Sequence, residues 1–416
     1  MTQSRRTRIF YANHTGRVSG GERVLLSMLQ VLDRRQYEPY VYCPRDGELS
    51  RHAEALDVPS LQAPPLHARF TWRPNRLLRY AASLWRTISA MRNAIGKLDP
   101  DLVHANSLRA GVVATLATIG TGRPVIWHVH DILPKHPLST AIRLIAYRSK
   151  RTRIVAVSYF AARAFCGNLP FRNRVQTIHN GIDLNCFPLK TPGSSTFRRE
   201  FGISDDAFLV CAVGQICARK GLRELVNAFS KIYAQAPRVH LVLVGKVIFE
   251  HEEPYREALV KTAVNSGIGD RLHFTGERED VAGVLQASDL LVLNSLAEPF
   301  GLVLVEAMSS GTAVLATRVG GIPEIVRDAE NGWLIERGDS AALASKLLEL
   351  SQNTDMLNQA AEFARNVTCP QFSLDRFQSN LHRLYAELVA HPAPTWTPRT
   401  ISELTRFERH QGGWNA

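Results

Sequence analysis

The chain has 416 residues, of which 45% are hydrophobic and 21% charged, and its formal net charge is +12. This length corresponds to two or three globular domains, and the composition excludes a mainly disordered, collagenous or coiled-coil protein. The charge is uneven, because residues 1–185 carry 27 Lys and Arg against 11 Asp and Glu, whereas residues 186–416 carry 23 against 27. The basic half favours an anionic partner, such as lipid headgroups, nucleic acid or a phosphorylated substrate.

Targeting and disulfide patterns are not found in the sequence. Its longest clean apolar run, residues 111–120, is half the roughly 20 residues that a membrane span requires. Residues 1–14 contain charges but no apolar stretch typical of a secretion signal. The six cysteines form no C-x-x-C pair, which argues against a zinc knuckle or a disulfide framework. We therefore expect a cytoplasmic protein, with attachment to the inner face of the cell membrane through the basic half.

Short β-rich apolar runs alternate with longer amphipathic stretches, a pattern typical of βαβ units and parallel sheets. In the first half this predicts strands at residues 8–12, 39–43, 101–105, 124–129, 153–157 and 175–178. In the second half it predicts strands at residues 208–213, 240–244, 271–274, 290–293, 313–316 and 333–335. The expected fold class is therefore α/β, with two Rossmann-like domains in tandem.

A segment rich in Pro and Ser, residues 181–195, separates the two series of strands, and the sign of the charge changes there. We expect one domain over residues 1–185 and a second over residues 186–375. A last helix is predicted over residues 373–389 and is followed by a Pro-rich tail.

Residues 69–95 combine a helical apolar stripe with flanking arginines and interspersed aromatic residues. A basic amphipathic helix of this kind is suited to a membrane interface. The alternative is a helix that packs on its own domain and turns its arginines toward water. Nucleic acid is not expected as a partner, because no nucleic-acid-binding motif accompanies the charge.

The most specific segment of the sequence covers residues 276–338. A predicted strand at 290–293 leads into a loop, and a helix is expected to begin near Phe300 and Gly301. Free N–H groups at a helix start, next to a glycine, suit a diphosphate. Glu298 and Glu306 flank this start. Since carboxylates repel phosphate, we expect both to accept hydrogen bonds from hydroxyl groups, which a sugar nucleotide offers on both sides of its diphosphate.

Two patterns that suggest other chemistry are set aside. Asp99-Pro100-Asp101 has the D-x-D form that can bind a divalent metal, but its proline is typical of a turn. No other Asp, Glu or His cluster has the spacing of metal ligands, and no G-x-x-x-x-G-K-[ST] motif is present. The sequence therefore predicts neither a metal site nor a P-loop kinase.

The segment 276–338 resembles the donor-binding signature of family 4 of the retaining glycosyltransferases, which have the GT-B fold. The E-x7-E element corresponds to Glu298 through Glu306, and residues 307–311 and 320–324 follow in the family's order. Earlier matches lie at residues 20–22, 128–131, 178–183 and 214–221. The resemblance implies two Rossmann-like domains facing each other across a cleft. The acceptor would bind to residues 1–185 and the nucleotide sugar to residues 186–375, and the C-terminal helix of residues 376–416 would pack back on the first domain.

The resemblance also implies roles for individual residues. Glu298 would hold hydroxyls of the donor sugar, and Glu306 the ribose hydroxyls. Lys220 would neutralise the departing diphosphate. His130 would lie beside the donor sugar near the reacting carbon, with His128 as the alternative in register. Further donor-binding groups would be the backbone N–H groups of Phe300, Gly301 and Leu302, the side chain of Arg219, and a tight loop at Gly20 and Gly21.

Histidines follow or end three of the predicted strands. His130 comes at the carboxyl end of the strand at 124–129, where ligands bind in open α/β sheets. His104 and His179 also end strands, and we expect both to be structural.

One position departs from the family pattern. Gln215 stands where many relatives have Arg. A glutamine cannot supply positive charge to a diphosphate, although it can donate hydrogen bonds, and Arg219 could compensate for the missing charge. We expect Gln215 to affect the rate of turnover more than donor binding.

The expected function is transfer of a sugar, with retention of configuration, from a UDP- or GDP-linked donor to an acceptor hydroxyl. The acceptor would be a lipid-linked, polysaccharide or glycoconjugate precursor, and neither a metal nor another cofactor is expected. Two alternatives stay open. One is a catalytically weak GT-B protein that serves as a scaffold in polysaccharide assembly, and the other is a GT-B-like sugar phosphorylase that uses inorganic phosphate.

Overall fold

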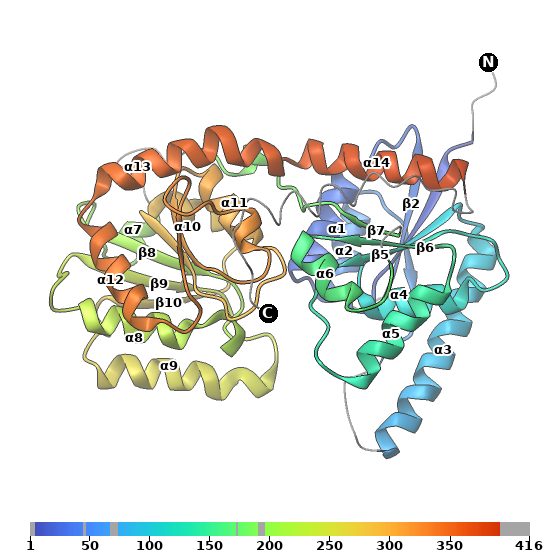
Figure 1. The fold of residues 1–416 in the computed structure, drawn as a ribbon, viewed down its shortest axis with the longest axis horizontal. Coiled ribbons are helices and arrows are strands. Elements are labelled where there is room, and N and C mark those ends of the chain that lie inside the picture. The colour runs from blue at the N-terminus through green and yellow to red at the C-terminus, as the bar shows by residue number, and fades with distance from the viewer. Residues whose placement is uncertain (1–4, 45–46, 67–73, 172–173, 190–195, 392–416) are drawn as a thin grey trace. The chain divides into compact units, whose positions relative to one another are not determined.

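The computed structural model describes residues 5–44, 47–66, 74–171, 174–189 and 196–391, with only the backbone for residues 74–80. The chain forms two compact units (Figure 1). The first consists of Met1–Asn180 together with Asp375–Ala416, and the second is Gly181–Leu374. The division falls at the start of the segment 181–195, where the composition changes.

The first unit is built on a seven-stranded sheet of parallel strands in the order β3-β2-β1-β4-β5-β6-β7. The order reverses between β1 and β4, so the loops that follow these two strands leave the sheet side by side. The strands are β1 (Thr7–Ala12), β2 (Tyr37–Cys43), β3 (Ser60–Gln62), β4 (Leu102–Ala105), β5 (Val125–Val129), β6 (Thr152–Ala156) and β7 (Val175–Thr177).

Helices cover the sheet of the first unit, and α3 lies beside α4 in Figure 1. The helices are α1 (Gly20–Val31), α2 (Glu48–Ala55), α3 (Pro74–Leu98), α4 (Leu108–Ala117), α5 (Pro137–Arg148), α6 (Tyr159–Cys166) and α14 (Leu374–Ala390). The apolar run at 111–120 is explained by α4, which packs against Trp127 of β5. A Cβ atom on Gly111 would lie 2.3 Å from the indole ring, so only glycine permits this approach.

The C-terminal helix α14 belongs to the core of the first unit. Its Phe377, Leu381 and Tyr385 are buried. The Tyr385 hydroxyl lies 3.3 Å from that of Tyr11 on β1, and Gln378 donates a hydrogen bond to the Val31 carbonyl at the end of α1. The first unit is therefore assembled from the two ends of the sequence.

The second unit contains a six-stranded parallel sheet in the order β10-β9-β8-β11-β12-β13. Here the strand order reverses between β8 and β11. The strands are β8 (Phe208–Val213), β9 (Val239–Val244), β10 (Leu272–Gly276), β11 (Leu290–Leu293), β12 (Ala313–Thr317) and β13 (Trp333–Ile335).

The helices of the second unit are joined by several short helical turns. The α-helices are α7 (Thr196–Glu200), α8 (Leu222–Ile232), α9 (Glu253–Asn265), α10 (Val281–Ala287), α11 (Leu302–Ser309), α12 (Ser340–Ser351) and α13 (Thr354–Phe363). The turns are η1 (Leu184–Cys186), η2 (Ala218–Lys220), η3 (Glu250–Glu252), η4 (Ile322–Glu324), η5 (Ala364–Thr368) and η6 (Cys369–Phe372). The two ends of this unit are bonded together, because Ile182 donates to the Phe372 carbonyl (3.0 Å) and Leu374 donates to the Ile182 carbonyl (2.8 Å).

The predicted α/β class with two Rossmann-like domains is confirmed. Each strand expected from the sequence is present within a few residues of its predicted bounds. The sequence did not indicate β3, because this edge strand has only three residues, none of them buried, and shows no apolar run. The last helix was expected at 373–389 and occupies Leu374–Ala390.

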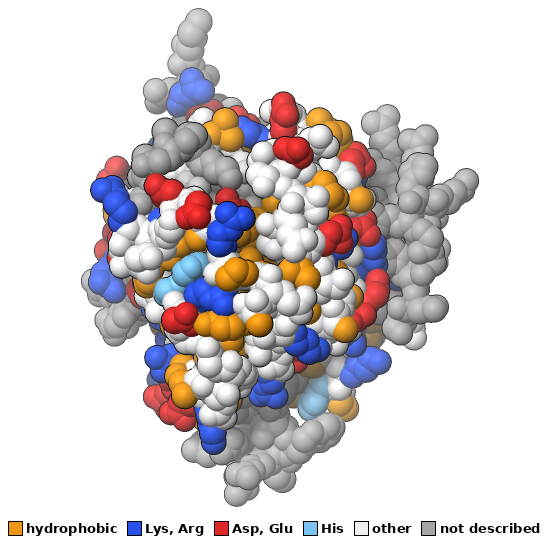
Figure 2. All heavy atoms as spheres, turned by 90° about the vertical axis from the view of Figure 1, so that its left-hand side faces the viewer, with side chains coloured by type: hydrophobic (Ala, Val, Ile, Leu, Met, Phe, Trp, Pro, Cys, Tyr) orange, Lys and Arg blue, Asp and Glu red, His pale blue; other side chains and the backbone are white. Residues whose placement is uncertain are grey.

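The surface of the second unit has mixed charge. Figure 2 views the molecule from the side of α12 and α13, where acidic and basic side chains are interspersed and hydrophobic side chains form small groups. Within the described part of the chain, no helix is long and apolar enough to cross a membrane.

Candidate functional site

In the second unit, charged residues gather in the loops that follow β8 and β11, the two strands at which the sheet order reverses. Lys220 ends the short helix η2 after β8, and Glu298 lies in the loop between β11 and α11. The Lys220 Nζ atom is 2.7 Å from Glu298 Oε2. Sequence analysis assigned both residues to the donor site, and the structure brings them into direct contact.

Glu298 is nearly buried, with 8% of its surface exposed. Its carboxylate also accepts a hydrogen bond from Ser295 Oγ at 3.1 Å and lies 3.8 Å from the guanidinium of Arg219. Burial by itself raises the pKa of this carboxyl group. The positive charges of Lys220 and Arg219 and the hydrogen bonds outweigh burial, so the pKa is lowered and Glu298 is ionised at neutral pH.

The loop at Gly320 and Gly321 holds the backbone of Glu298. Gly321 N donates to the Glu298 carbonyl at 2.9 Å. Gly320 has a φ of +60°, and a Cβ atom there would lie 1.8 Å from the same carbonyl oxygen. Only glycine fits this position, so the glycine pair of the signature sets the backbone position of the glutamate.

The residues expected at the helix start lie where the sequence placed them. Phe300 is buried and packs edge-on against Phe372, with the ring centroids 5.7 Å apart. Gly301 has a φ of +103° and precedes α11, which begins at Leu302 and has no side-chain cap. Glu306 lies in the second turn of α11 and is half-buried. Unlike Glu298, it is placed by the helix itself.

Gln215, the departure from the family pattern, is engaged within the second unit. Its Nε2 atom donates to Glu252 Oε2 at 2.6 Å. Arg219 donates to the Ala297 carbonyl at 3.2 Å, and its side chain is 46% exposed. The positive charge beside Glu298 therefore comes from Arg219 and Lys220, while the amide of Gln215 is occupied by a neighbouring carboxylate.

In the first unit, polar residues gather at the carboxyl ends of β1, β4 and β5. His130 follows β5, Asn106 follows β4, and Gly21 lies in the first turn of α1. Asn106 Oδ1 is 3.1 Å from His130 Nε2, and Asn106 Nδ2 donates to the Gly21 carbonyl at 3.0 Å. A Cβ atom on Gly21 would lie 3.3 Å from the His130 ring. The structure thus brings Gly21 and His130 together, with Gly20 one position earlier at the start of α1.

The start of α1 is fixed by a second layer of hydrogen bonds. Ser19 and Glu22 form a capping box, in which Ser19 N donates to Glu22 Oε2 at 3.1 Å. Asn13, directly after β1, donates to Glu22 Oε1 at 3.1 Å. The sequence gives no sign of Asn13, Asn106 and Ser295, because a single Asn or Ser after a strand carries no distinctive pattern. Only the reversal of strand order would have indicated them.

His128, the alternative in register, lies in the core. It is 0% exposed, and its Nδ1 atom is 3.3 Å from Nε2 of the equally buried His104. Its ring centroid is 4.1 Å from that of His130. Burial lowers the pKa of His130 to about 4 and that of His104 to about 3, and it places the pKa of His128 well below the usual value. All three imidazoles are therefore neutral at pH 7.

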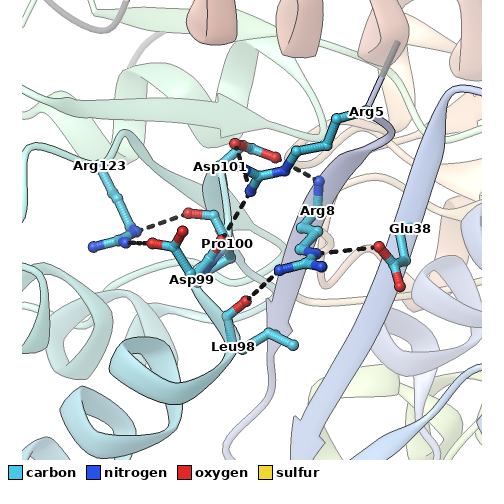
Figure 3. A network of polar contacts seen from close by, with 8 residues as sticks. All are labelled: Arg5, Arg8, Glu38, Leu98, Asp99, Pro100, Asp101 and Arg123. Carbon is cyan, nitrogen blue, oxygen red and sulfur yellow. Dashed lines mark hydrogen bonds and ion pairs between the residues drawn. The ribbon is translucent and has the colours of Figure 1, made fainter. Parts of the chain in front are cut away.

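The D-x-D string forms a turn held by arginines (Figure 3). Asp99 has a φ of +50° and pairs with Arg123, which also donates to the Pro100 carbonyl at 2.7 Å. Asp101 accepts a hydrogen bond of 2.7 Å from the Arg8 backbone N–H. Across the described residues, no group of three or more His, Cys, Asp or Glu side chains is placed to hold a metal ion.

The basic helix α3 packs on the first unit through its apolar stripe. Met91 and Ile95 are buried in the core, and Leu84 and Ile88 pack against it. Trp85 points away from this core and is 70% exposed. Among the predicted aromatic residues, Phe70 and Trp72 lie outside the described residues, as does the side chain of Tyr80.

Comparisons with known proteins find relatives of both units. A family model for "Glycosyltransferase Family 4" matches residues 18–185, and one for "Glycosyl transferases group 1" matches residues 194–367. An N-acetyl-alpha-D-glucosaminyl L-malate synthase of Bacillus anthracis is 31% identical over 52% of this chain and 54% of its own length. A D-inositol 3-phosphate glycosyltransferase of Mycolicibacterium smegmatis is 29% identical over 71% of this chain and 70% of its own length.

Among solved structures, HepE of Anabaena, described in complex with UDP and glucose and with UDP-glucose, is similar to this chain. It has a TM-score of 0.78 and 26% sequence identity, over 92% of this chain and 100% of HepE. One family model thus matches the first unit and the other matches the second, and the similarity to HepE covers both. The chain belongs to family 4 of the glycosyltransferases, the group 1 enzymes of GT-B fold.

Proposed function

We propose that this protein transfers a sugar from a nucleotide-sugar donor to an acceptor hydroxyl with retention of configuration and without a metal ion. The observation that carries the proposal is the contact between Lys220 Nζ and Glu298 Oε2 at the reversal of strand order in the second unit. The side chain of Lys220 is 15% exposed and that of Glu298 is 10% exposed, so a positive and a negative charge lie together at one place. A glycosyl diphosphate needs both signs there.

The two partners would have separate tasks when a donor binds. Lys220 would turn to the diphosphate and stabilise the negative charge that develops as it leaves. Glu298, released from the ion pair and ionised, would accept hydrogen bonds from sugar hydroxyls. Glu306 on α11 would accept from the ribose hydroxyls, and the N–H groups of Phe300, Gly301 and Leu302 would donate to sugar or phosphate oxygens. Arg219 would add positive charge beside Lys220.

UDP-linked sugars are the first donors to test, because HepE is described in complex with UDP-glucose. The first unit would bind the acceptor, while His130 would serve the donor sugar near the reacting carbon and the loop at Gly20 and Gly21 would serve the diphosphate, as the family resemblance implies. The positive charge of residues 1–185 favours an acceptor with phosphate groups, such as a lipid-linked pyrophosphate precursor.

A thermal-shift panel of UDP- and GDP-sugars in EDTA tests the donor site. A donor at 100 times its dissociation constant stabilises the protein by about 2.7 kcal/mol, which raises the melting temperature by several degrees. Glu306→Ala should abolish the shift. Glu349→Ala, which removes a helix carboxylate paired with Lys346 on α12, should leave it intact. Absence of a shift with every donor, from folded protein, would remove the support for this function.

Retention and metal independence are tested on the product. NMR of the anomeric proton would show the same configuration as in the donor, and the rate in EDTA would equal the rate with added Mg²⁺. Inversion, or activity restored only by the metal, would contradict these parts of the proposal.

Contact with the inner face of the membrane would be made through the basic first unit. The exposed Trp85 on α3 offers an anchor, with Arg86 next to it in the sequence and Arg92 farther along the same helix. Vesicles containing phosphatidylglycerol should sediment with the protein, and vesicles of phosphatidylcholine alone should not. Trp85→Ser should weaken sedimentation. Val264→Ser, which removes an equally exposed residue from α9, should have no effect. Equal sedimentation with both kinds of vesicle would contradict this contact.

Gln215 favours one alternative, a scaffold with weak catalysis. Since its amide donates to Glu252, it would leave the diphosphate one cation short. Donor binding without detectable transfer to any acceptor would support the scaffold, and turnover that requires inorganic phosphate in place of a nucleotide would support a phosphorylase.

A further inference from the structure

Asn106 contacts two parts of the first unit to which the proposed function gives a role, namely the loop at Gly20 and Gly21 and the side chain of His130. It is 1% exposed and follows β4, between the loop after β1 and His130 after β5. One side of its amide faces the Gly21 carbonyl and the other faces the His130 ring. No sequence motif singled out this residue.

The contacts determine which amide atom faces which partner. The Gly21 carbonyl oxygen can only accept, so the amide atom 3.0 Å from it must be the donor Nδ2. The atom that faces His130 is then Oδ1, which can only accept. The His130 Nε2 atom, 3.1 Å away, must therefore carry the proton.

The second ring nitrogen of His130 is left as an acceptor. Burial keeps His130 neutral at pH 7, since its pKa is about 4. A neutral imidazole with its proton on Nε2 has a lone pair on Nδ1. Nδ1 of His130 makes no hydrogen bond to any residue that the structure describes. It does not belong to the fully buried atoms without a partner either, so Nδ1 can be reached by a ligand.

The ring also packs against a buried neighbour. The ring centroid of His128 lies 4.1 Å from that of His130. His128 is itself bonded to His104 through Nδ1, which fixes its position beside His130. Asn106 thus selects the protonated nitrogen of His130.

We infer that Asn106 is a positioning residue that holds His130 with its proton on Nε2, so that Nδ1 accepts a hydrogen bond from a substrate hydroxyl on the first unit. The part of this inference that concerns the substrate rests on the proposed function. The part that concerns the proton can be measured on the protein alone.

The test is nitrogen-15 NMR of histidine-labelled full-length protein at pH 7, with the His130 signals assigned by their loss in His130→Gln. Wild type should show a single form of His130 protonated on Nε2. Asn106→Leu, which keeps the size but removes the acceptor, should shift a measurable fraction of the proton to Nδ1. Asn106→Ala also removes the acceptor and should shift the proton in the same direction, and it serves as the second variant if Asn106→Leu does not fold.

Thr115→Val is the matched control. It removes a buried hydrogen bond of the same unit, from Trp127 Nε1 to Thr115 Oγ1 at 2.8 Å, and should leave the His130 signals unchanged. In transfer assays Asn106→Leu should lower kcat about tenfold or more with the donor KM within about twofold of wild type, whereas Thr115→Val should keep kcat.

The outcomes separate the inference from the proposed function. If wild type carries the His130 proton on Nδ1, or if Asn106→Leu leaves the proton on Nε2 as in wild type, the inference is overturned whatever the activity. If the proton shifts but kcat equals that of Thr115→Val, the role of Nδ1 toward substrate is overturned. Absence of transfer by wild type with every donor contradicts the proposed function, while the NMR result on Asn106 stands.

Discussion

The Tyr385 hydroxyl lies 2.7 Å from Nδ1 of His104, although the two residues are 281 positions apart in the sequence. The same hydroxyl is 3.3 Å from that of Tyr11, and all three side chains are fully buried. Burial raises the pKa of Tyr385 well above its usual value and lowers that of His104, so both groups are neutral. A single oxygen atom thus ties the C-terminal helix to β1 and β4.

Tyr385→Phe should destabilise the first unit. The change leaves the buried His104 Nδ1 and Tyr11 hydroxyl without this partner, at a cost of about 1–3 kcal/mol in the free energy of unfolding. Urea denaturation measures the loss. Tyr37→Phe is the control, because this residue packs edge-on against the same ring of Tyr385 at 5.8 Å. Equal stability of the two variants would show that the hydrogen bond to His104 contributes nothing.

Lys220→Met should remove donor binding and destabilise the second unit. Glu298 would remain buried with less positive charge around it, so its pKa should rise, and stability at pH 7 should fall by up to about 3 kcal/mol. Adding Glu298→Gln should recover part of this loss, because the uncompensated carboxylate is then absent. A double-mutant cycle by chemical denaturation measures the coupling. If the effects of the two single substitutions on the free energy of unfolding simply add in the double variant, the contact between Lys220 and Glu298 contributes nothing to stability.

Gly320→Ala should disrupt the loop that holds Glu298. A methyl group at Gly320 collides with the Glu298 carbonyl and also requires the left-handed backbone conformation. Gly338→Ala shares only the second effect, because its φ is +83° and nothing lies within 4 Å of the added Cβ. The control should lose about 1–2 kcal/mol. Gly320→Ala should lose clearly more, together with the thermal shift produced by the donor, and matching melting temperatures would contradict the close approach.

Stability should fall as the pH is lowered from about 6.5 toward 4. The pKa of His14 and of His130 is about 4 in the folded protein, and that of His104 is about 3, because burial disfavours the charged imidazole. In this range the unfolded chain binds protons that the folded chain does not. Each such group therefore lowers the free energy of unfolding by up to about 1.4 kcal/mol for each pH unit. Denaturation at several pH values measures the slope, which His14→Gln should reduce. An unchanged slope in that variant would show that His14 is not buried neutral.

The sequence was sufficient for the fold because strands and helices alternate with little ambiguity. The resemblance to the family's motifs also indicated Lys220 and Glu298. Their ion pair could not be predicted, since it depends on β8 and β11 being neighbours across the reversal of strand order. In the first unit, the separate reversal between β1 and β4 brings Asn106 beside Gly21.

Histidine roles were the hardest to predict. His128 and His130 are two positions apart, and a shift of one register would exchange their surroundings. The structure separates them, because His128 bonds to His104 in the core and His130 bonds to Asn106 at the strand end. Sequence analysis expected His104 to be structural but had no means to link it to Tyr385, since contacts between the two ends of a chain leave no local pattern.

The return of α14 has a consequence for biosynthesis. The sheet of the first unit is complete by Thr177, yet its last helix begins only at Leu374, after the entire second unit. While the ribosome makes Gly181–Leu374, Met28, Val31 and Leu32 on and after α1 have no α14 to cover them. Until α14 has been made, this apolar surface of the first unit stays uncovered. During that time the nascent chain is prone to aggregation and is a target for chaperones.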